Sequence, residues 1–286
     1  MPSSPAPPAV VRSERDVAAW DAAARRVALS GGDGVMLWRT WGEGEPVVLL
    51  HGGAGSWIHW VRNIRALIAA GRSVWVPDLP GFGESTAVRG AHDADALPGP
   101  VEAALHDLVG GAACDLVGFS FGAMVATLIA AQHPARVRRL VLVGAPALGI
   151  RPVEPVDVRS WRHLDSEAER TAAHRNNLSV LMLHDAESID DFTVGLQAFN
   201  AERDRMKRRR LSRTDLLLRA LPGARCPVYG IWGEHDALYR SRTALIEPAL
   251  RAARDFRWLR LVERAGHWVQ FERSDAFDRA LAEALG

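Results

Sequence analysis

The chain has 286 residues, of which 48% are hydrophobic and 24% charged, and its formal net charge is +1. This length allows one large α/β domain, or a domain that carries an insertion, with a substantial buried core. The balanced charge argues against nucleic acid or a membrane surface as a partner. A membrane span is not expected either, because no run of about 18 apolar residues occurs.

The N-terminal residues are proline-rich and lack both the basic and the apolar region of a secretory signal. We therefore expect a disordered tail over residues 1–12 and a cytoplasmic location. The two cysteines, Cys114 and Cys226, have neither metal-binding nor disulfide spacing. Both are expected to be buried thiols.

After the tail, the composition of residues 14–29 predicts a helix that ends before a glycine-rich turn. Strands and helices then alternate. Helices are predicted over residues 57–70, 99–109 and 121–133, and the strands between them are Val35–Trp41, Pro46–Leu50, Ser73–Pro77, Cys114–Val117 and Val137–Val143. Such alternation indicates a parallel sheet with right-handed crossovers and helices on both faces.

The alternation breaks after Gly149, and no clear apolar strand follows until Pro227–Trp232. Residues 150–222 are therefore predicted to be an insertion. Beyond them we expect a helix over residues 240–253, a last strand at Phe256–Val262 and a closing helix at Ser274–Leu285. Within the insertion one apolar helical face is predicted, formed by Ile189, Phe192, Leu196, Phe199 and Met206.

A basic cluster lies at the end of the insertion and consists of Arg203, Arg205, Lys207, Arg208, Arg209, Arg210 and Arg213. A run of arginines on one side of a helix is most often a solvated face. Two alternatives stay open: one arginine reaches a substrate carboxylate, or the cluster binds nucleic acid or lipid.

The sequence Gly118-Phe119-Ser120-Phe121-Gly122 joins a predicted strand to a predicted helix. The spacing Gly-x-Ser-x-Gly is that of a nucleophile elbow, in which the glycines let strand and helix crowd together around a strained serine. The hydroxyl group of Ser120 is therefore a candidate nucleophile above the edge of the sheet.

A serine nucleophile needs a base, and that base needs a carboxylate to fix its tautomer. His267 directly follows the last strand, and Asp236 directly follows the strand before it. Because the carboxyl ends of parallel strands meet at one edge, both are expected beside Ser120. Glu234 is the fallback for the carboxylate.

The loop His51-Gly52-Gly53 follows the strand that is expected to supply one backbone donor of an oxyanion hole. We choose the N–H groups of Gly53 and Phe121 as the two donors. His51 is expected to orient this loop by hydrogen bonding rather than to perform chemistry.

Together these motifs resemble the α/β-hydrolase-fold serine hydrolases that carry a helical cap. The resemblance covers roughly residues 35–286 and rests, in chain order, on Leu50-His51-Gly52, Asp78 to Ser85, Gly118 to Gly122, Gly233 to Asp236 and Gly266-His267. It implies an α/β core over residues 13–149 and 223–286, and a helical cap over residues 150–222.

Within that fold, haloalkane dehalogenases and epoxide hydrolases use an aspartate at the elbow, so Ser120 argues against both. The segment Gly266 to Glu272 is similar to that of hydrolases that cleave carbon–carbon bonds of ring-cleavage products. Those enzymes usually have an asparagine before the serine and a cap arginine on the substrate carboxylate. Because Phe119 occupies the asparagine position here, the sequence favours a general serine hydrolase.

We therefore predict an esterase-like hydrolase acting on an acyl bond of a small, partly apolar molecule, with Phe119, Trp268 and His51 in the pocket. The alternatives are a carbon–carbon bond hydrolase, a cofactor-free lyase or perhydrolase, and a ligand-binding receptor with negligible turnover. Neither a cofactor nor a metal is expected, since no ligand spacing such as HExxH occurs. Assembly as a homodimer is left open.

Overall fold

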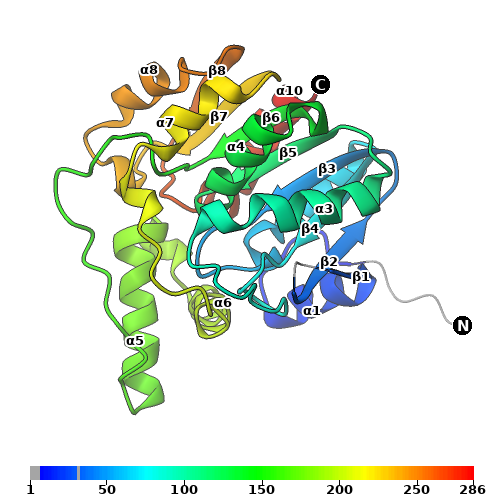
Figure 1. The fold of residues 1–286 in the computed structure, drawn as a ribbon. Helices are drawn as coiled ribbons and strands as arrows, with labels where there is room; N and C mark the ends of the chain where they lie inside the picture. Colours follow the sequence, from blue (N-terminus) through cyan, green and yellow to red (C-terminus); the bar gives the residue numbers. More distant parts are fainter. Residues whose placement is uncertain (1–6, 31–32) are drawn as a thin grey trace, which may run out of the picture.

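The structure, a computed structural model, describes residues 7–30 and 33–286. In this part of the chain, eight strands form one sheet in the order β1-β2-β4-β3-β5-β6-β7-β8 (Figure 1). Their bounds are β1 (Arg25–Ser30), β2 (Val35–Trp41), β3 (Glu45–Leu50), β4 (Arg72–Pro77), β5 (Cys114–Phe119), β6 (Val137–Val143), β7 (Val228–Gly233) and β8 (Phe256–Val262).

The sheet is mostly parallel, as predicted. Strands β3 to β8 all pair in parallel, and β1 and β2 form an antiparallel edge. The loops that follow β3, β5, β7 and β8 consequently meet at one edge of the sheet, where ligands bind in open α/β folds.

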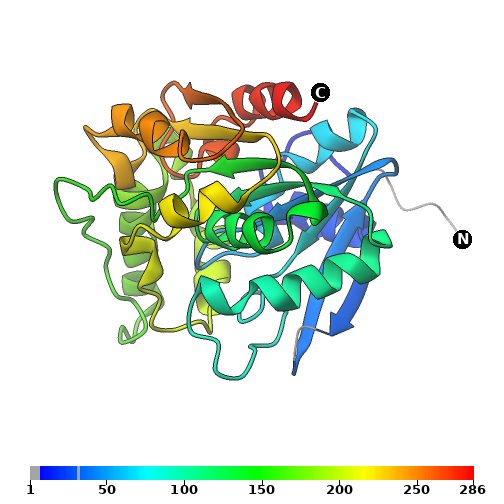
Figure 2. The same cartoon turned by 45° about the horizontal axis from the view of Figure 1, so that its top comes forward.

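Helices cover both faces of this sheet (Figure 2). One face packs against α3, α4, α7 and α8, and the other against α2 and α10. The helices are α1 (Glu14–Ala23), α2 (Ile64–Ala69), α3 (Pro98–Val109), α4 (Phe121–Gln132), α5 (Glu167–Asn177), α6 (Asp191–Glu202), α7 (Leu216–Ala220), α8 (Ile246–Leu250), α9 (Val269–Glu272) and α10 (Ser274–Leu285).

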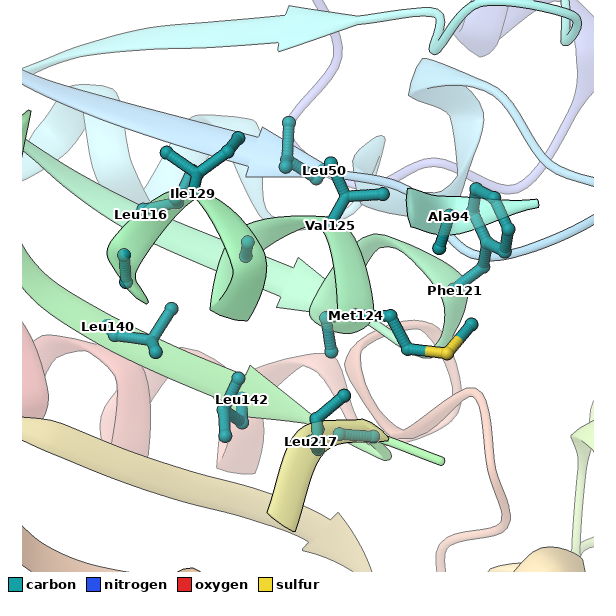
Figure 3. Packing of buried hydrophobic residues seen from close by; sticks show 14 of the residues in the cluster. Leu50, Ala94, Leu116, Phe121, Met124, Val125, Ile129, Leu140, Leu142 and Leu217 are labelled. Atoms are coloured by element: carbon teal, nitrogen blue, oxygen red, sulfur yellow. The ribbon is translucent and has the colours of Figure 1, made fainter. Parts of the chain in front are cut away.

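The two cores explain why the central strands are apolar throughout. In β3, Val48 and Leu50 belong to the core on the α4 side, whereas Val47 and Leu49 belong to the core on the α10 side. Successive side chains of a strand point to opposite faces, so a strand covered on both faces needs apolar residues at every position. Figure 3 shows the α4 side, where residues of α4 lie over Leu116 and other apolar residues of the sheet.

Residues 150–222, which we call the inserted segment, run between β6 and β7 and contain α5, α6 and α7. Figure 1 shows α5 standing away from the sheet. A π-helix, η4 (Leu178–Met182), continues α5. The predicted apolar face is only partly helical, because α6 begins at Asp191 and ends at Glu202 and so leaves Ile189 and Met206 outside it.

The N-terminal helix is shorter than predicted. It ends at Ala23, and residues 25–30 form β1 instead, paired with β2. Pairing along an available sheet edge outweighs the helical composition of this stretch, since local propensity is a weak prior.

Packed structure also begins earlier than the predicted tail over residues 1–12 allows. Residues 1–6 of that tail lie outside the described residues. Val11 is only 3% exposed, and the Trp20 indole Nε1 donates a hydrogen bond to the carbonyl oxygen of Pro8 at 3.2 Å.

The predicted helix over residues 240–253 consists mostly of tight turns, and only α8 within it is α-helical. Cys114 and Cys226 are buried free thiols, and burial raises their pKa values to about 12 and about 11. No helix in the described ranges has the length and apolar character needed to cross a membrane.

The tight contact of α4 with the sheet gives a stability prediction. A Cβ atom at Gly122 would lie 2.4 Å from the carbonyl oxygen of Leu50, and backbone cannot move aside cheaply. We expect Gly122→Ala to lower the free energy of unfolding by about 3 kcal/mol, measured by urea denaturation. Gly195→Ala, in the middle of α6 and next to the flexible end of Glu14, is the control and should be neutral or stabilising. Equal stability of both variants would contradict this account.

Candidate active site

Ser120 occupies a strained turn between β5 and α4. Its backbone angles are φ 50° and ψ −113°, a combination that a non-glycine residue adopts only when its surroundings impose it. A Cβ at Gly118 would lie 2.6 Å from the Cα of Ala123. The two glycines of the motif are therefore required by the close approach of strand and helix, which is the predicted elbow geometry.

Ser120, His267 and Asp236 form a continuous hydrogen-bonded chain. The Oγ of Ser120 lies 3.0 Å from Nε2 of His267, and Nδ1 of His267 lies 2.8 Å from Oδ2 of Asp236. His267 is 3% exposed and Asp236 is fully buried. Asp236 accepts from Nδ1–H, which leaves Nε2 unprotonated and able to accept the serine proton.

Of the two carboxylates considered for this role, the structure brings only Asp236 to the histidine. Its other oxygen, Oδ1, accepts a hydrogen bond from the backbone N–H of Leu238 at 2.9 Å. Glu234, the fallback, has a side chain that is 49% exposed and lies 3.5 Å from Nε2 of His235. Asp236 is therefore the carboxylate that contacts the ring.

The two expected oxyanion donors also lie together. Gly53 and Phe121 line one cavity with Ser120 and His267, and a Cβ built on Gly53 would be 3.7 Å from the Cβ of Phe121. Gly144, which the sequence reasoning missed, packs against the same group: its φ is +51°, and a Cβ there would be 3.1 Å from Nδ1 of His267. A side chain at this position would push the histidine out of place.

Of the three predicted pocket residues, Phe119 is the one that lines the cavity. Its ring lies 5.0 Å from that of His267. Trp268 is instead fully buried and stacks on Phe271 at 4.0 Å. The side chain directly after the histidine points into the core, which sequence spacing did not reveal.

His51 is also fully buried and is absent from the cavity lining. Its Nδ1–H donates to the carbonyl oxygen of Gly52 at 2.8 Å, and its Nε2 accepts from the N–H of Leu79 at 2.8 Å. Burial lowers the pKa of His51, which keeps the ring neutral and both bonds intact. It is bonded to the loop, the contact expected of a residue that orients it, and it does not form part of the pocket wall.

A second buried histidine, His59, supports the same loop. Its Nδ1 accepts a hydrogen bond from the N–H of Gly52 at 3.2 Å, and burial lowers the pKa of His59 well below its usual value. The ring lies 5.4 Å from Phe119 and 4.9 Å from Trp268. Nothing in the spacing of His59 from the other motifs indicated this contact.

The cavity above Ser120 has a volume of about 1100 Å³ and extends into the inserted segment. Its walls carry both apolar and polar side chains. Apolar side chains such as Met124 and Leu181 line the cavity together with His174 of α5 and Gln197 of α6, both of which are buried. Such a combination suits a small, partly apolar molecule with a few polar groups.

The basic cluster differs from its predicted form, because α6 ends at Glu202 and the arginines lie on irregular chain and a short 3₁₀ turn. Arg205 bonds to backbone carbonyl oxygens, among them that of Gly83 at 3.0 Å. Arg209 turns inward and lines the cavity. Its Nη2 pairs with Asp204 at 2.7 Å, while its Nη1 is buried and has no hydrogen-bond partner among the described residues.

The described ranges contain no group of three or more His, Cys, Asp or Glu side chains arranged to bind an ion.

Residues 45–177 match the family model described as the alpha/beta hydrolase fold. The chain is 30% identical to a 2-hydroxy-6-oxo-6-phenylhexa-2,4-dienoate hydrolase of Burkholderia cepacia, over 85% of this chain and 88% of that protein. It is also 30% identical to a 2-hydroxy-6-oxononadienedioate/2-hydroxy-6-oxononatrienedioate hydrolase of Cupriavidus pinatubonensis, over 85% and 87%.

Solved structures share the fold at lower identity. A meta-cleavage product hydrolase from Pseudomonas fluorescens superposes with a TM-score of 0.74 and 22% identity, covering 91% of this chain and 97% of that one. A thermophilic esterase from Thermogutta terrifontis gives a TM-score of 0.69 and 21% identity, covering 92% and 98%.

The Asp236 contact gives a prediction about the tautomer of His267. In Asp236→Asn the amide oxygen keeps the Leu238 bond, so the NH₂ group faces Nδ1 and forces the proton onto Nε2. That ring cannot accept a proton from Ser120. We expect kcat for a p-nitrophenyl ester to fall on the order of 10³- to 10⁴-fold, with the melting temperature close to that of the parent protein. A kcat within a few-fold of the parent would show that Asp236 does not set the tautomer.

Proposed function

Because this chain belongs to the α/β-hydrolase family, we propose that it is a serine hydrolase that cleaves an acyl bond with Ser120, His267 and Asp236. The observation that carries the proposal is the bonded chain from Ser120 Oγ through His267 to the buried carboxylate of Asp236. The strained backbone at Ser120 and the cavity directly above it support the same role.

The proposed reaction has two steps. The oxygen of Ser120 attacks the substrate carbonyl while His267 Nε2 takes its proton, and the buried Asp236 stabilises the resulting imidazolium. The N–H groups of Gly53 and Phe121 hold the negative charge on the former carbonyl oxygen. His267 then returns the proton to the leaving group, and water repeats the sequence to release the acid and free Ser120.

We further propose that the inserted segment acts as a cap that closes the site. Residues of α5 and α6 line the same cavity as Ser120 and His267. Enclosure by these helices would exclude bulk water and strengthen the electrostatic interactions at the reacting carbonyl. The substrate would be a small molecule that fits a cavity of about 1100 Å³.

A second candidate, hydrolysis of a carbon–carbon bond, is favoured by the names of the relatives and by Arg209. The relatives are named as hydrolases of dienoates, which carry a carboxylate. In this chain Arg209 lies beside the candidate oxyanion donor Gly53 with Nη1 unpartnered among the described residues, so it is available to an anion. Against this candidate, Phe119 stands where those enzymes usually have asparagine.

A substrate comparison separates the two candidates. We expect short p-nitrophenyl esters to be hydrolysed with a higher kcat/KM than a 2-hydroxy-6-oxo-dienoate followed by loss of its colour, with Ser120→Ala inactive on both. If the dienoate is the better substrate, Arg209→Gln should raise its KM about 10-fold or more and leave neutral esters unchanged, because only the anion loses a charged partner. Turnover that persists in Ser120→Ala would overturn the serine mechanism for either bond.

A further inference from the structure

Glu272, at the end of α9, has a buried carboxylate that joins two separate parts of the chain. One oxygen, Oε2, accepts the backbone N–H of Gly266 at 2.6 Å. The other, Oε1, accepts the N–H groups of His184 at 2.9 Å and of Asp185 at 2.7 Å. Gly266 directly precedes His267, whereas His184 and Asp185 belong to the inserted segment.

The carboxylate is 7% exposed, and within residues 7–30 and 33–286 no cation forms a salt bridge with it. A buried charge without a counter-ion is costly unless hydrogen bonds satisfy it. Here backbone N–H groups supply that stabilisation, and bonds to an ionised acceptor are about twice as strong as neutral ones. The buried carboxylate of Glu272 is therefore stabilised only while Gly266 and the segment with His184 and Asp185 keep their positions.

The other neighbour of His267 is attached to the same segment. The N–H of Trp268 donates to the carbonyl oxygen of Met182 at 2.7 Å. Gly266 is crowded so closely that a Cβ there would lie 2.8 Å from the nitrogen of His184. The residues before and after His267 are therefore both held by backbone hydrogen bonds, Gly266 by Glu272 and Trp268 by the end of the π-helix η4. Such π-helical turns are often found at functional positions.

The loop that carries Asp236 touches the segment as well. The ring of His184 stacks on that of His235 at 3.7 Å between centroids and 15° between planes. The N–H of His235 donates to the carbonyl oxygen of Ala265 at 2.9 Å. Residues 182–185, which we call the latch segment, hence contact both loops that supply the base and its carboxylate.

We propose that Glu272 is a positioning residue that ties the latch segment to the His267 loop, so that the placement of the inserted segment and the distance from His267 to Ser120 are set together. This inference rests on the proposed serine mechanism. Glu272 itself touches neither substrate nor the reacting atoms; it acts through the backbone of Gly266.

The test variant is Glu272→Gln, which keeps the shape and removes the charge. Its amide can present oxygen to only one of the two groups of N–H donors, so its NH₂ opposes either Gly266 or the latch segment. We expect kcat and the rate of the acylation burst with p-nitrophenyl acetate to fall about 10- to 100-fold, because small displacements of a catalytic group have effects of this size, with KM within about twofold. Glu263→Gln, at an exposed position after β8, is the matched control and should leave all values unchanged.

If Glu272 had a purely structural role, Glu272→Gln would lower the melting temperature and leave kcat unchanged. The proton NMR spectrum of His267 therefore serves as a second readout. The low-field proton resonance between His267 and Asp236, identified by its loss in Asp236→Asn, should broaden in Glu272→Gln at a temperature well below unfolding. Parent-like kcat, burst rate and resonance in a folded Glu272→Gln protein would overturn the proposal.

If Glu272→Gln does not fold, amide hydrogen exchange of the unmodified protein tests the proposal instead. Amide hydrogen exchange should show Gly266, His184 and Asp185 opening with the same free energy, as members of one unit. Exchange of Gly266 that is independent of the latch segment would overturn the proposal. If instead the three amides open together while Ser120→Ala retains activity, the link between Gly266 and the latch segment is supported and the serine mechanism is wrong.

Discussion

The crowding of β5 against α4 is the constraint on which the rest of the site depends. With glycine at positions 118 and 122, the helix starts within contact distance of the strand and of the end of β3, so the turn at Ser120 adopts a positive φ. This turn points the hydroxyl away from the sheet, toward the loops after β7 and β8. The strain is held by two extensive cores, one on each face of the sheet, that leave neither strand nor helix free to relax.

Around this turn, neutral buried histidines and backbone groups build an environment with little freedom. His51 and His59 both hydrogen-bond to the backbone of Gly52, and burial lowers the pKa of each. Because both rings stay uncharged, they fix the loop without placing a cation beside His267. A preorganised loop of this kind suits stabilisation of an oxyanion, since its donors need no reorganisation during the reaction.

Sequence alone predicted the parts that depend on local pattern. The bounds of β2, β6, β8 and α10 match those expected, because the local sequence pattern marks them directly. The position of Ser120, Asp236 and His267 after the parallel strands β5, β7 and β8 was enough to predict that they lie together. In contrast, β1 was missed because its pairing with β2 is a tertiary effect that composition does not record. The inward turn of Arg209, the buried position of Trp268 and the contacts of Glu272 depend on segments far apart in the chain, so no local signal revealed them.

The central claim is that Ser120 is the nucleophile, and covalent labelling tests it most directly. The protein is treated with a fluorophosphonate, digested, and the modified peptide is sequenced by mass spectrometry. The account predicts one modified residue, Ser120, and slow labelling in His267→Ala, in which the serine lacks its base. Modification of a different residue, or labelling at an undiminished rate without His267, would contradict it.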